Sequence, residues 1–246
     1  MARLAPVHWW YHGLRDMIAK TLAMRRFAIP AQSNVLDAGC GTGENLQLLK
    51  RRLDPAYLGG FDASPQAVEL AQATVPNAHV YVSDICEPQV HVDQVDLLLS
   101  CDVLYIPGAA ASLNGLKHLV AHLRPQGLFI VHLPAYQWLY SEHDVAVHTQ
   151  QRFTARQVRH LMSQLGLSTE LLTYRIFFLF PAIMLYRLRT IVGPRRKGAD
   201  ARSDLALPSA LTNRLLATLL EFENTAISRG LQWPWGSSIY AVGRKP

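Results

Sequence analysis

Residues 37–43 read Asp-Ala-Gly-Cys-Gly-Thr-Gly and lie between an apolar run and a stretch with leucines at near-helical spacing. Glycines at a strand-to-helix junction let the chain turn tightly and let a ligand approach the backbone without a Cβ in the way. The helix that follows directs its free N–H groups at the same point. A dinucleotide loop of the form GxGxxG would need glycine at position 44, where this chain has Glu44. The pattern GxGxG, preceded by an acid, therefore disfavours a nicotinamide dehydrogenase.

Two acids follow the loop at the ends of the next two expected strands. Asp62 comes about twenty residues after the glycines, where a carboxylate can accept hydrogen bonds from both hydroxyls of a ribose. Asp84 can accept from an adenine amino group, while Ile85 packs against the ring. Because open α/β sheets bind ligands at the carboxyl ends of their parallel strands, the three elements predict one nucleoside-binding crevice.

These segments carry a family resemblance. The sequences VLDAGCGTGENLQLL (35–49), YLGGFDASPQAVELA (57–71) and VSDI (82–85) resemble motif I and the two acidic motifs that follow it in class I S-adenosylmethionine-dependent methyltransferases. The resemblance covers about residues 33–133. It implies S-adenosylmethionine as cofactor, held by Asp37, Gly39, Cys40, Gly41, Gly43, Asp62, Ala63, Asp84, Ile85 and Cys101. An acid at position 37 fits a cofactor that has an ammonium and a sulfonium group but no phosphate.

The candidate catalytic residues lie downstream, in the stretch Tyr140–Asp144 and at His148. A hydroxyl acceptor usually needs a base, and histidine is the common choice. The sharper hypothesis makes His143 that base, with Asp144 or Glu142 orienting it. The alternative is that these polar residues pin a loop through side-chain hydrogen bonds. Metal binding by His143, Asp144 and His148 fits no standard ligand spacing, and we expect no metal.

Four further residues are expected to contact the acceptor. Tyr105 and His132 follow the fourth and fifth expected strands, Tyr11 belongs to an aromatic block near the N-terminus, and Arg152 precedes Phe153. Gln151 stands where a second basic residue would strengthen an anion site, which weakens that role for Arg152. The aromatic block is either a lid over the site or a helix anchored to the core by its aromatic area.

The ends of the chain carry a second, narrower resemblance. HWWY (8–11), the stretch LPAYQWLYSEHD…H…RF (133–153) and WGSSIYAVGRKP (235–246) resemble an uncharacterised bacterial subgroup of these methyltransferases. That subgroup is associated with glycan or lipid-linked sugar assembly and has no settled substrate.

The remaining pattern predicts the fold. Strands are expected at 34–37, 57–61, 79–82, 95–100, 128–132, 167–174 and 237–242, with helices between most of them and a turn at 124–127. Alternating strands and helices predict an α/β protein with a doubly wound, mostly parallel seven-stranded sheet of Rossmann-like type. We expect a single domain, 1–246, made of an N-terminal helical lid (1–30), a cofactor-binding core (31–175), a helical insertion (176–235) and a last strand (236–246).

The positive charge of the chain gathers near that insertion. The chain has a net charge of +6, and the segment Arg175–Arg202 holds seven basic residues against Asp200 alone. The apolar run Ile176–Leu188 beside it is too short for a membrane span. Contact with anionic lipid headgroups or phosphate-bearing substrates and a solvated loop beside a core helix are equally good interpretations.

Composition bounds the setting. Three scattered cysteines favour a reducing cytoplasm. Residues 1–20 lack the apolar core of a signal peptide. We therefore expect a cytoplasmic protein, at most peripheral to the inner face of a membrane. The expected function is methyl transfer to a small or lipid-like acceptor, most simply to a hydroxyl. Two alternatives stay open: a nucleic-acid methyltransferase, and a non-catalytic module that only binds the cofactor. The basic segment of this chain lacks the interleaved stacking aromatics of a strand-binding groove, which disfavours the nucleic-acid methyltransferase.

Overall fold

A seven-stranded sheet forms the centre of the computed structural model, which describes residues 7–185 and 208–246. The strands are β1 (Asn34–Ala38), β2 (Tyr57–Asp62), β3 (His79–Val82), β4 (Val95–Cys101), β5 (Leu123–Pro134), β6 (Ser168–Arg175) and β7 (Ser238–Arg244). Their spatial order is β3-β2-β1-β4-β5-β7-β6, and β7 runs antiparallel to both of its neighbours, whereas the other pairs are parallel. The predicted doubly wound, mostly parallel seven-stranded sheet is confirmed.

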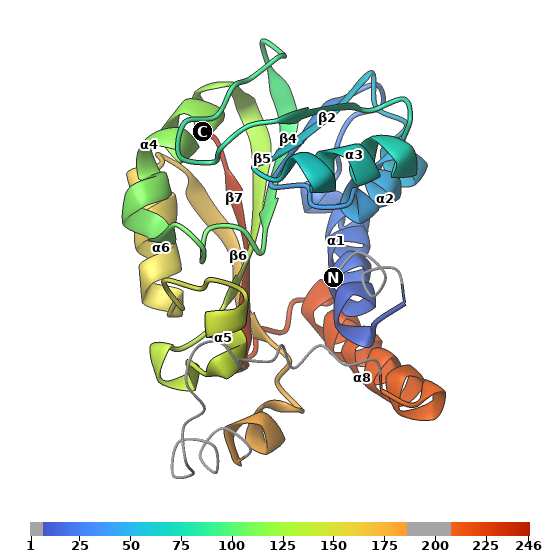
Figure 1. Cartoon of the computed structure of the whole chain (residues 1–246), viewed down its shortest axis with the longest axis vertical. Helices are drawn as coiled ribbons and strands as arrows, with labels where there is room; N and C mark the ends of the chain where they lie inside the picture. Colours follow the sequence, from blue (N-terminus) through green and yellow to red (C-terminus); the bar gives the residue numbers. More distant parts are fainter. Residues whose placement is uncertain (1–6, 186–207) are drawn as a thin grey trace.

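Helices cover both faces of this sheet (Figure 1). One face carries α1 (Trp9–Ala23), α2 (Glu44–Leu53) and α3 (Pro65–Thr74), and the other carries α4 (Gly108–Ala121) and α6 (Ala155–Gln164). The short helices η1 (Arg25–Phe27), η2 (Gln137–Leu139) and α5 (Glu142–Ala146) connect these elements, and α8 (Ala210–Ser228) lies beside α1.

The two faces give two separate apolar cores, as expected for a sheet buried on both sides. Side chains alternate along a strand, so neighbouring residues of β4 enter different cores. Leu98 packs with the residues of α4 and α6, whereas Leu97 and Leu99 pack with those of α1, α2 and α3.

Two boundaries differ from the sequence-based expectation. β5 begins at Leu123, so the predicted turn 124–127 is already strand; Gln126 takes a left-handed φ of 65°, and the register with β4 shifts between Val95 and Leu97. This irregularity absorbs the turn residues without ending the strand. In the N-terminal helical segment expected over 1–30, the α-helix ends at Ala23, and only the 3-10 turn η1 follows it.

The predicted insertion between β6 and β7 is described in part. Residues 180–185 are helical and α8 follows from Ala210, while the basic residues Arg187, Arg189, Arg195, Arg196, Lys197 and Arg202 lie outside the described residues. Within the described ranges, no helix combines the length and apolar character needed to cross a bilayer.

The last residue of β6, Arg175, is buried and joins four elements. Its side chain is only 1% exposed, and Nη2 donates to the Gly13 carbonyl of α1 at 2.9 Å. Nε donates to Asn224 Oδ1 of α8 at 3.3 Å, and Nη1 lies 3.2 Å from His132 Nε2 of β5. Arg175 therefore adds no charge to a basic surface, although it is one of the seven basic residues of the segment 175–202, because its charge is satisfied inside the fold.

The carboxylate of Glu223, also buried, completes this arrangement. It accepts hydrogen bonds from the backbone N–H groups of Ile176 and Phe177 at 2.6 and 2.8 Å. Of the neighbouring charges, that of Glu223 stabilises the Arg175 guanidinium most. The chain leaving β6 is thereby fixed against α8.

We expect Arg175→Met to lower the free energy of unfolding by about 3–5 kcal/mol, because it leaves Glu223 and the other partners buried without a counterpart. Urea denaturation monitored by circular dichroism measures this change. Arg124→Met is the matched control, since Arg124 pairs with Asp96 on the surface and such pairs contribute about 0–1 kcal/mol. Equal losses in the two variants would contradict the structural role of Arg175.

Candidate active site

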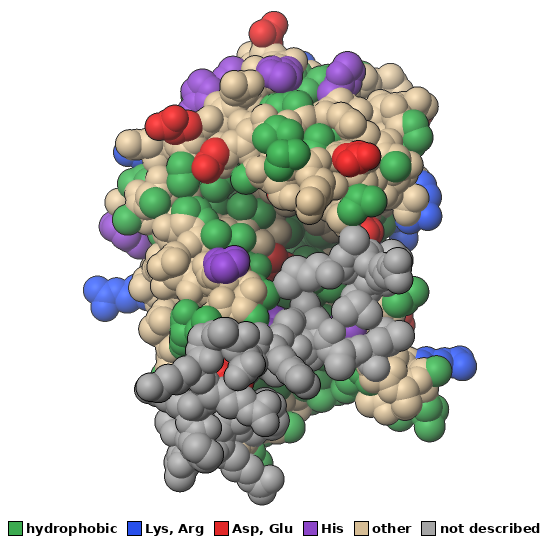
Figure 2. Space-filling view, in the orientation of Figure 1, with side chains coloured by type: hydrophobic (Ala, Val, Ile, Leu, Met, Phe, Trp, Pro, Cys, Tyr) green, Lys and Arg blue, Asp and Glu red, His purple; other side chains and the backbone are tan. Residues whose placement is uncertain are grey.

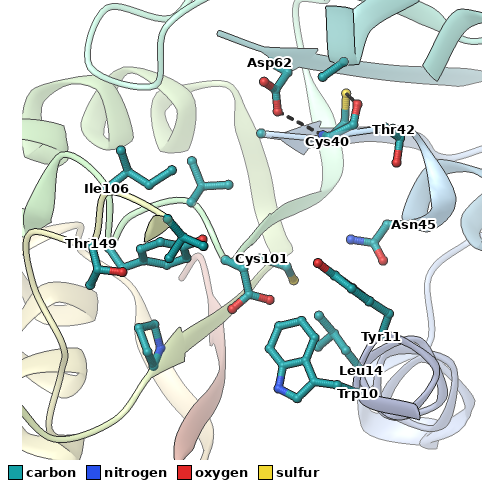
Figure 3. Close-up of a pocket in the computed structure, with 18 of the residues that line it drawn as sticks. Trp10, Tyr11, Leu14, Cys40, Thr42, Asn45, Asp62, Cys101, Ile106 and Thr149 are labelled. Atoms are coloured by element: carbon teal, nitrogen blue, oxygen red, sulfur yellow. Dashed lines mark hydrogen bonds between the residues drawn. The ribbon is translucent and has the colours of Figure 1, made fainter. Parts of the chain in front are cut away.

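A cleft of about 1100 Å³ opens at the carboxyl ends of the parallel strands. It lies where the strand order reverses between β1 and β4, the position at which open α/β sheets leave a crevice. The loops after β1, β2, β3 and β4 line it, and α1 closes it from the side with Trp10, Tyr11 and Leu14 (Figure 3).

The glycine loop after β1 forms one wall of this cleft. Gly39 and Gly41 have left-handed φ values of 83° and 53°, and both line the cleft. The N–H groups of Gly39 and Cys40 both donate to the Phe61 carbonyl of β2 at 2.8 Å, which ties the loop to the neighbouring strand. A Cβ on Gly39 would stand 2.1 Å from Val103 Cγ2, so only glycine fits there.

The two acids after β2 and β3 lie along the same wall. Asp62 Oδ2 accepts from the Gly41 N–H at 3.0 Å, the bond drawn in Figure 3, and Oδ1 accepts from the Ser64 N–H at 2.9 Å. Asp84 Oδ1 accepts from the Cys86 N–H at 2.8 Å. These backbone bonds fix both carboxylates while leaving lone pairs for a ligand, and Ala63 and Ile85 line the cleft beside them.

Asp37 lies beneath the loop, fully buried. Neither carboxylate oxygen has a hydrogen-bond partner among the described residues. Burial raises the pKa of this carboxyl to about 7, with the Asp62 charge as a second cause and the nearby Asn45 amide lowering it in part. An unpartnered buried carboxylate is costly unless a cationic or hydrogen-bond-donating group satisfies it, so the site fits a ligand with such a group at this end.

Most of the residues predicted to hold the cofactor thus meet in one place. Cys40 and Cys101 line the cleft with the residues named above, whereas Asp37 and Gly43 do not. Gly43, with a φ of 90°, instead lets α2 start close to α3, since a Cβ there would come within 3.1 Å of Ala71 Cα.

Aromatic side chains form the opposite side of the cleft. Tyr11 and Tyr105, both predicted acceptor contacts, line it, and Figure 3 shows Tyr11 directed from α1 toward Cys101. The Trp10 and Tyr11 rings meet edge to face at 4.9 Å. Burial, and next the Asp102 charge, raises the pKa of Tyr11 to about 12 and raises that of Tyr105 as well. Both phenols are therefore protonated at neutral pH and can donate a hydrogen bond.

The three residues predicted to be catalytic, His143, Asp144 and His148, differ in their surroundings. His143 lines the cleft, but the Asp144 carboxylate pairs with Arg152 Nε at 2.7 Å and caps α5 through the N–H and hydroxyl of Ser141. His148 is exposed and does not line the cleft. For Asp144 the structure matches the loop-pinning alternative. No group of three His, Cys, Asp or Glu residues able to hold a metal occurs in the described ranges.

Arg152 and His132 also have structural partners. Arg152 lines the cleft, yet its Nη1 donates to the Ala135 carbonyl at 2.8 Å in addition to its pairing with Asp144. His132 is fully buried behind the cleft, with Nδ1 2.9 Å from both carboxylate oxygens of Asp102. His132 does not line the cleft, whereas its partner Asp102, which directly follows β4, does.

Comparison with known proteins agrees with this geometry. Residues 35–127 match a family model described as a methyltransferase domain. Trans-aconitate 2-methyltransferase from Escherichia coli is 34% identical over 116 residues, covering 44% of this chain and 42% of that protein. The Enterobacter enzyme of the same name is 30% identical over 113 residues, covering 45% and 43%. The chain thus spans less than half the length of the curated relatives it matches.

Solved structures extend the likeness to nearly the whole chain, at the level of fold. An S-adenosylmethionine-dependent methyltransferase from Mesorhizobium loti superimposes with a TM-score of 0.59 at 14% identity, over 92% of this chain and 98% of that one. A chain from a complex with the Trm112 methyltransferase activator of Haloferax volcanii gives 0.64 at 17% identity, over 100% and 92%.

The fold and site therefore define a class: the fold is that of S-adenosylmethionine-dependent methyltransferases. More particularly, residues 35–127 of this chain match the family model of a methyltransferase domain. The residues present fit the cofactor of that class, since the unpartnered Asp37 carboxylate suits its ammonium end and the fixed carboxylates of Asp62 and Asp84 suit its nucleoside end.

We expect Gly39→Ala to weaken S-adenosylmethionine binding at least tenfold, because the new Cβ would collide with Val103 and displace the loop. Isothermal titration calorimetry measures the affinity, with circular dichroism to verify folding. Gly166→Ala is the control: Gly166 also has a left-handed φ, of 70°, but open space around it. Unaltered affinity in Gly39→Ala would show that the loop does not hold the cofactor.

Cofactor affinity should also depend on the ionisation of Asp37. Its folded-state pKa of about 7 is raised, so a cationic ligand must displace a proton below that pH. Affinity for S-adenosylmethionine is then expected to rise roughly tenfold between pH 5.5 and 7. Titrations across this range measure the slope, and Asp37→Asn should abolish it. A flat profile in the unmodified protein would rule out this role.

Proposed function

We propose that this chain transfers the methyl group of S-adenosylmethionine to a hydroxyl of a small or lipid-like acceptor. The observation that supports it is the continuity of one cleft, which joins the glycine loop and the acids of the nucleoside wall to the aromatic wall formed by α1 and the loop after β4. The cofactor supplies an activated methyl on its sulfonium, so the protein has mainly to align an acceptor with it.

His143 is the proposed general base. It is the histidine of the predicted catalytic group that lines the cleft, on the short helix α5. The neighbouring pairing of Asp144 with Arg152 fixes the start of that helix and thereby positions the His143 backbone.

A lipid-like acceptor is supported by the surface next to the cleft. Phe178 and Phe222 are exposed, with ring centroids 6.0 Å apart, and Leu215 and Trp235 add further exposed apolar area. Such a patch can contact a membrane or the apolar part of an acceptor, in keeping with a protein working in the cytoplasm at the inner face of a membrane.

The test uses purified protein, radiolabelled S-adenosylmethionine and fractionated cell extract, with transfer of label into an extract component as the readout. We expect His143→Ala to lower the rate of transfer at least a hundredfold, the usual contribution of a general base, while cofactor affinity stays within twofold.

His160→Ala is the matched control, since His160 is exposed on α6 and remote from the cleft lining. If no fraction accepts label from protein that binds the cofactor, the chain is a binding module and the proposal fails. If transfer occurs and survives in His143→Ala, the methyltransferase activity stands without His143 as base.

A further inference from the structure

The carboxylate of Asp102 is held rigidly at the border of the cleft. Its side chain is 20% exposed and lines the cleft, while both oxygens lie 2.9 Å from His132 Nδ1. The Asp102 backbone has a left-handed φ of 59°, a conformation that aspartate and asparagine tolerate better than most residues. A backbone in this region at the end of β4 turns the carboxylate away from the strand.

The hydrogen bonds around His132 show which groups carry charge. Arg175 Nη1 can only donate, so His132 Nε2, 3.2 Å away, must accept and hold a lone pair. The ring proton therefore lies on Nδ1 and is donated to Asp102, which leaves the imidazole neutral and the carboxylate ionised. The positive charge of Arg175 interacts most with the buried Glu223 and also, across the His132 ring, with Asp102. Asp102 thus presents its carboxylate to the cleft, while the compensating Arg175 charge stays buried behind His132.

The lining of the cleft is acidic, although the whole chain is basic. Five carboxylates line it: Glu44, Asp62, Asp84, Asp102 and Asp144. The two guanidinium groups that line it belong to Arg15 and Arg152, and each interacts with one of these acids, Glu44 and Asp144 respectively. On the coloured part of the face shown in Figure 2, Lys and Arg side chains stand at the edges, whereas acidic side chains lie both at the upper edge and further in, among apolar ones.

On the acceptor side, this leaves Asp102 among aromatic rings. The edge of Trp10 lies over His132, with ring centroids 5.6 Å apart, and Tyr11 contacts Trp10. Both indole and phenol rings attract cations through their faces. Ser238, at the start of β7, adds a hydroxyl that is buried, lines the same cleft and has no hydrogen-bond partner. A fixed anion, aromatic rings and an unpartnered hydroxyl are all groups that a protonated amine can contact.

We infer that the acceptor carries a positively charged nitrogen, which Asp102 binds beside Trp10 and Tyr11, an inference that rests on the proposed function. It sets this chain apart from its relatives named for trans-aconitate, a polycarboxylate, which the Asp102 charge would repel. His132 and Arg175 act through Asp102 as positioning residues. The nitrogen bound here anchors the acceptor, and its hydroxyl is the group methylated.

The test is a charge series of one shape, titrated calorimetrically into the full chain saturated with S-adenosylhomocysteine. Benzylamine, benzyl alcohol and benzoate are the cationic, neutral and anionic probes. We expect benzylamine to bind at least tenfold more tightly than the other two, and Asp102→Asn to abolish that preference. Asp93→Asn, at an exposed position outside the cleft, should retain it.

Asparagine keeps the shape of Asp102 and its tolerance for the left-handed backbone, and the series in the unmodified protein does not depend on any variant folding. Equal binding of benzoate, no binding of benzylamine, an unaltered preference in Asp102→Asn, or methylation of trans-aconitate would each overturn the inference. The proposed function fails separately, by absence of cofactor binding or methyl transfer in the unmodified protein.

Discussion

Arg175 carries a positive charge into the interior at the end of β6, where water cannot solvate it, and much of the acceptor side of the molecule is arranged around that charge. Its hydrogen bonds reach α1 through Gly13, α8 through Asn224 and β5 through His132. Since a buried guanidinium is tolerated only when its donors are satisfied, these elements must come together for any of them to be stable there. The same requirement fixes the imidazole that orients Asp102. Stability and the geometry of the aromatic wall of the cleft are thus two consequences of one buried charge.

The cofactor side depends on a different and more local constraint. Three glycines with left-handed φ bring the backbone after β1 close to β2 and to Val103, and the buried Asp37 lies beneath them without a partner. This arrangement costs free energy in the unliganded protein, because a carboxylate is desolvated with nothing bound to it. A ligand that brings a cation to this carboxylate would recover that cost.

Between the two sides, α5 shows how polar residues can stabilise a local structure without taking part in catalysis. The stretch Tyr140–Asp144 attracts attention because it concentrates groups that perform acid–base catalysis. In the fold, Asp144 is used by Ser141 and Arg152, and the remaining candidate from that stretch at the cleft is His143. Residue types alone do not distinguish a helix cap with its ion pair from a catalytic dyad, since both need a carboxylate next to donors.

The sequence by itself determined the order of strands and helices, the glycine loop, and the acids Asp62 and Asp84, because each depends on spacing along a short stretch of chain. The prediction of a turn at 124–127 was wrong, since local turn signals do not contain the pairing of β5 with β4 and β7. Only the tertiary structure determined how Asp102 and the aromatic wall of the cleft are held in place. Its hydrogen bonds join residues separated by 30 positions for Asp102 and His132, 43 for His132 and Arg175, and 49 for Arg175 and Asn224. No periodicity or motif spans such distances, and these partners meet only because the sheet and the α1–α8 pair bring them together.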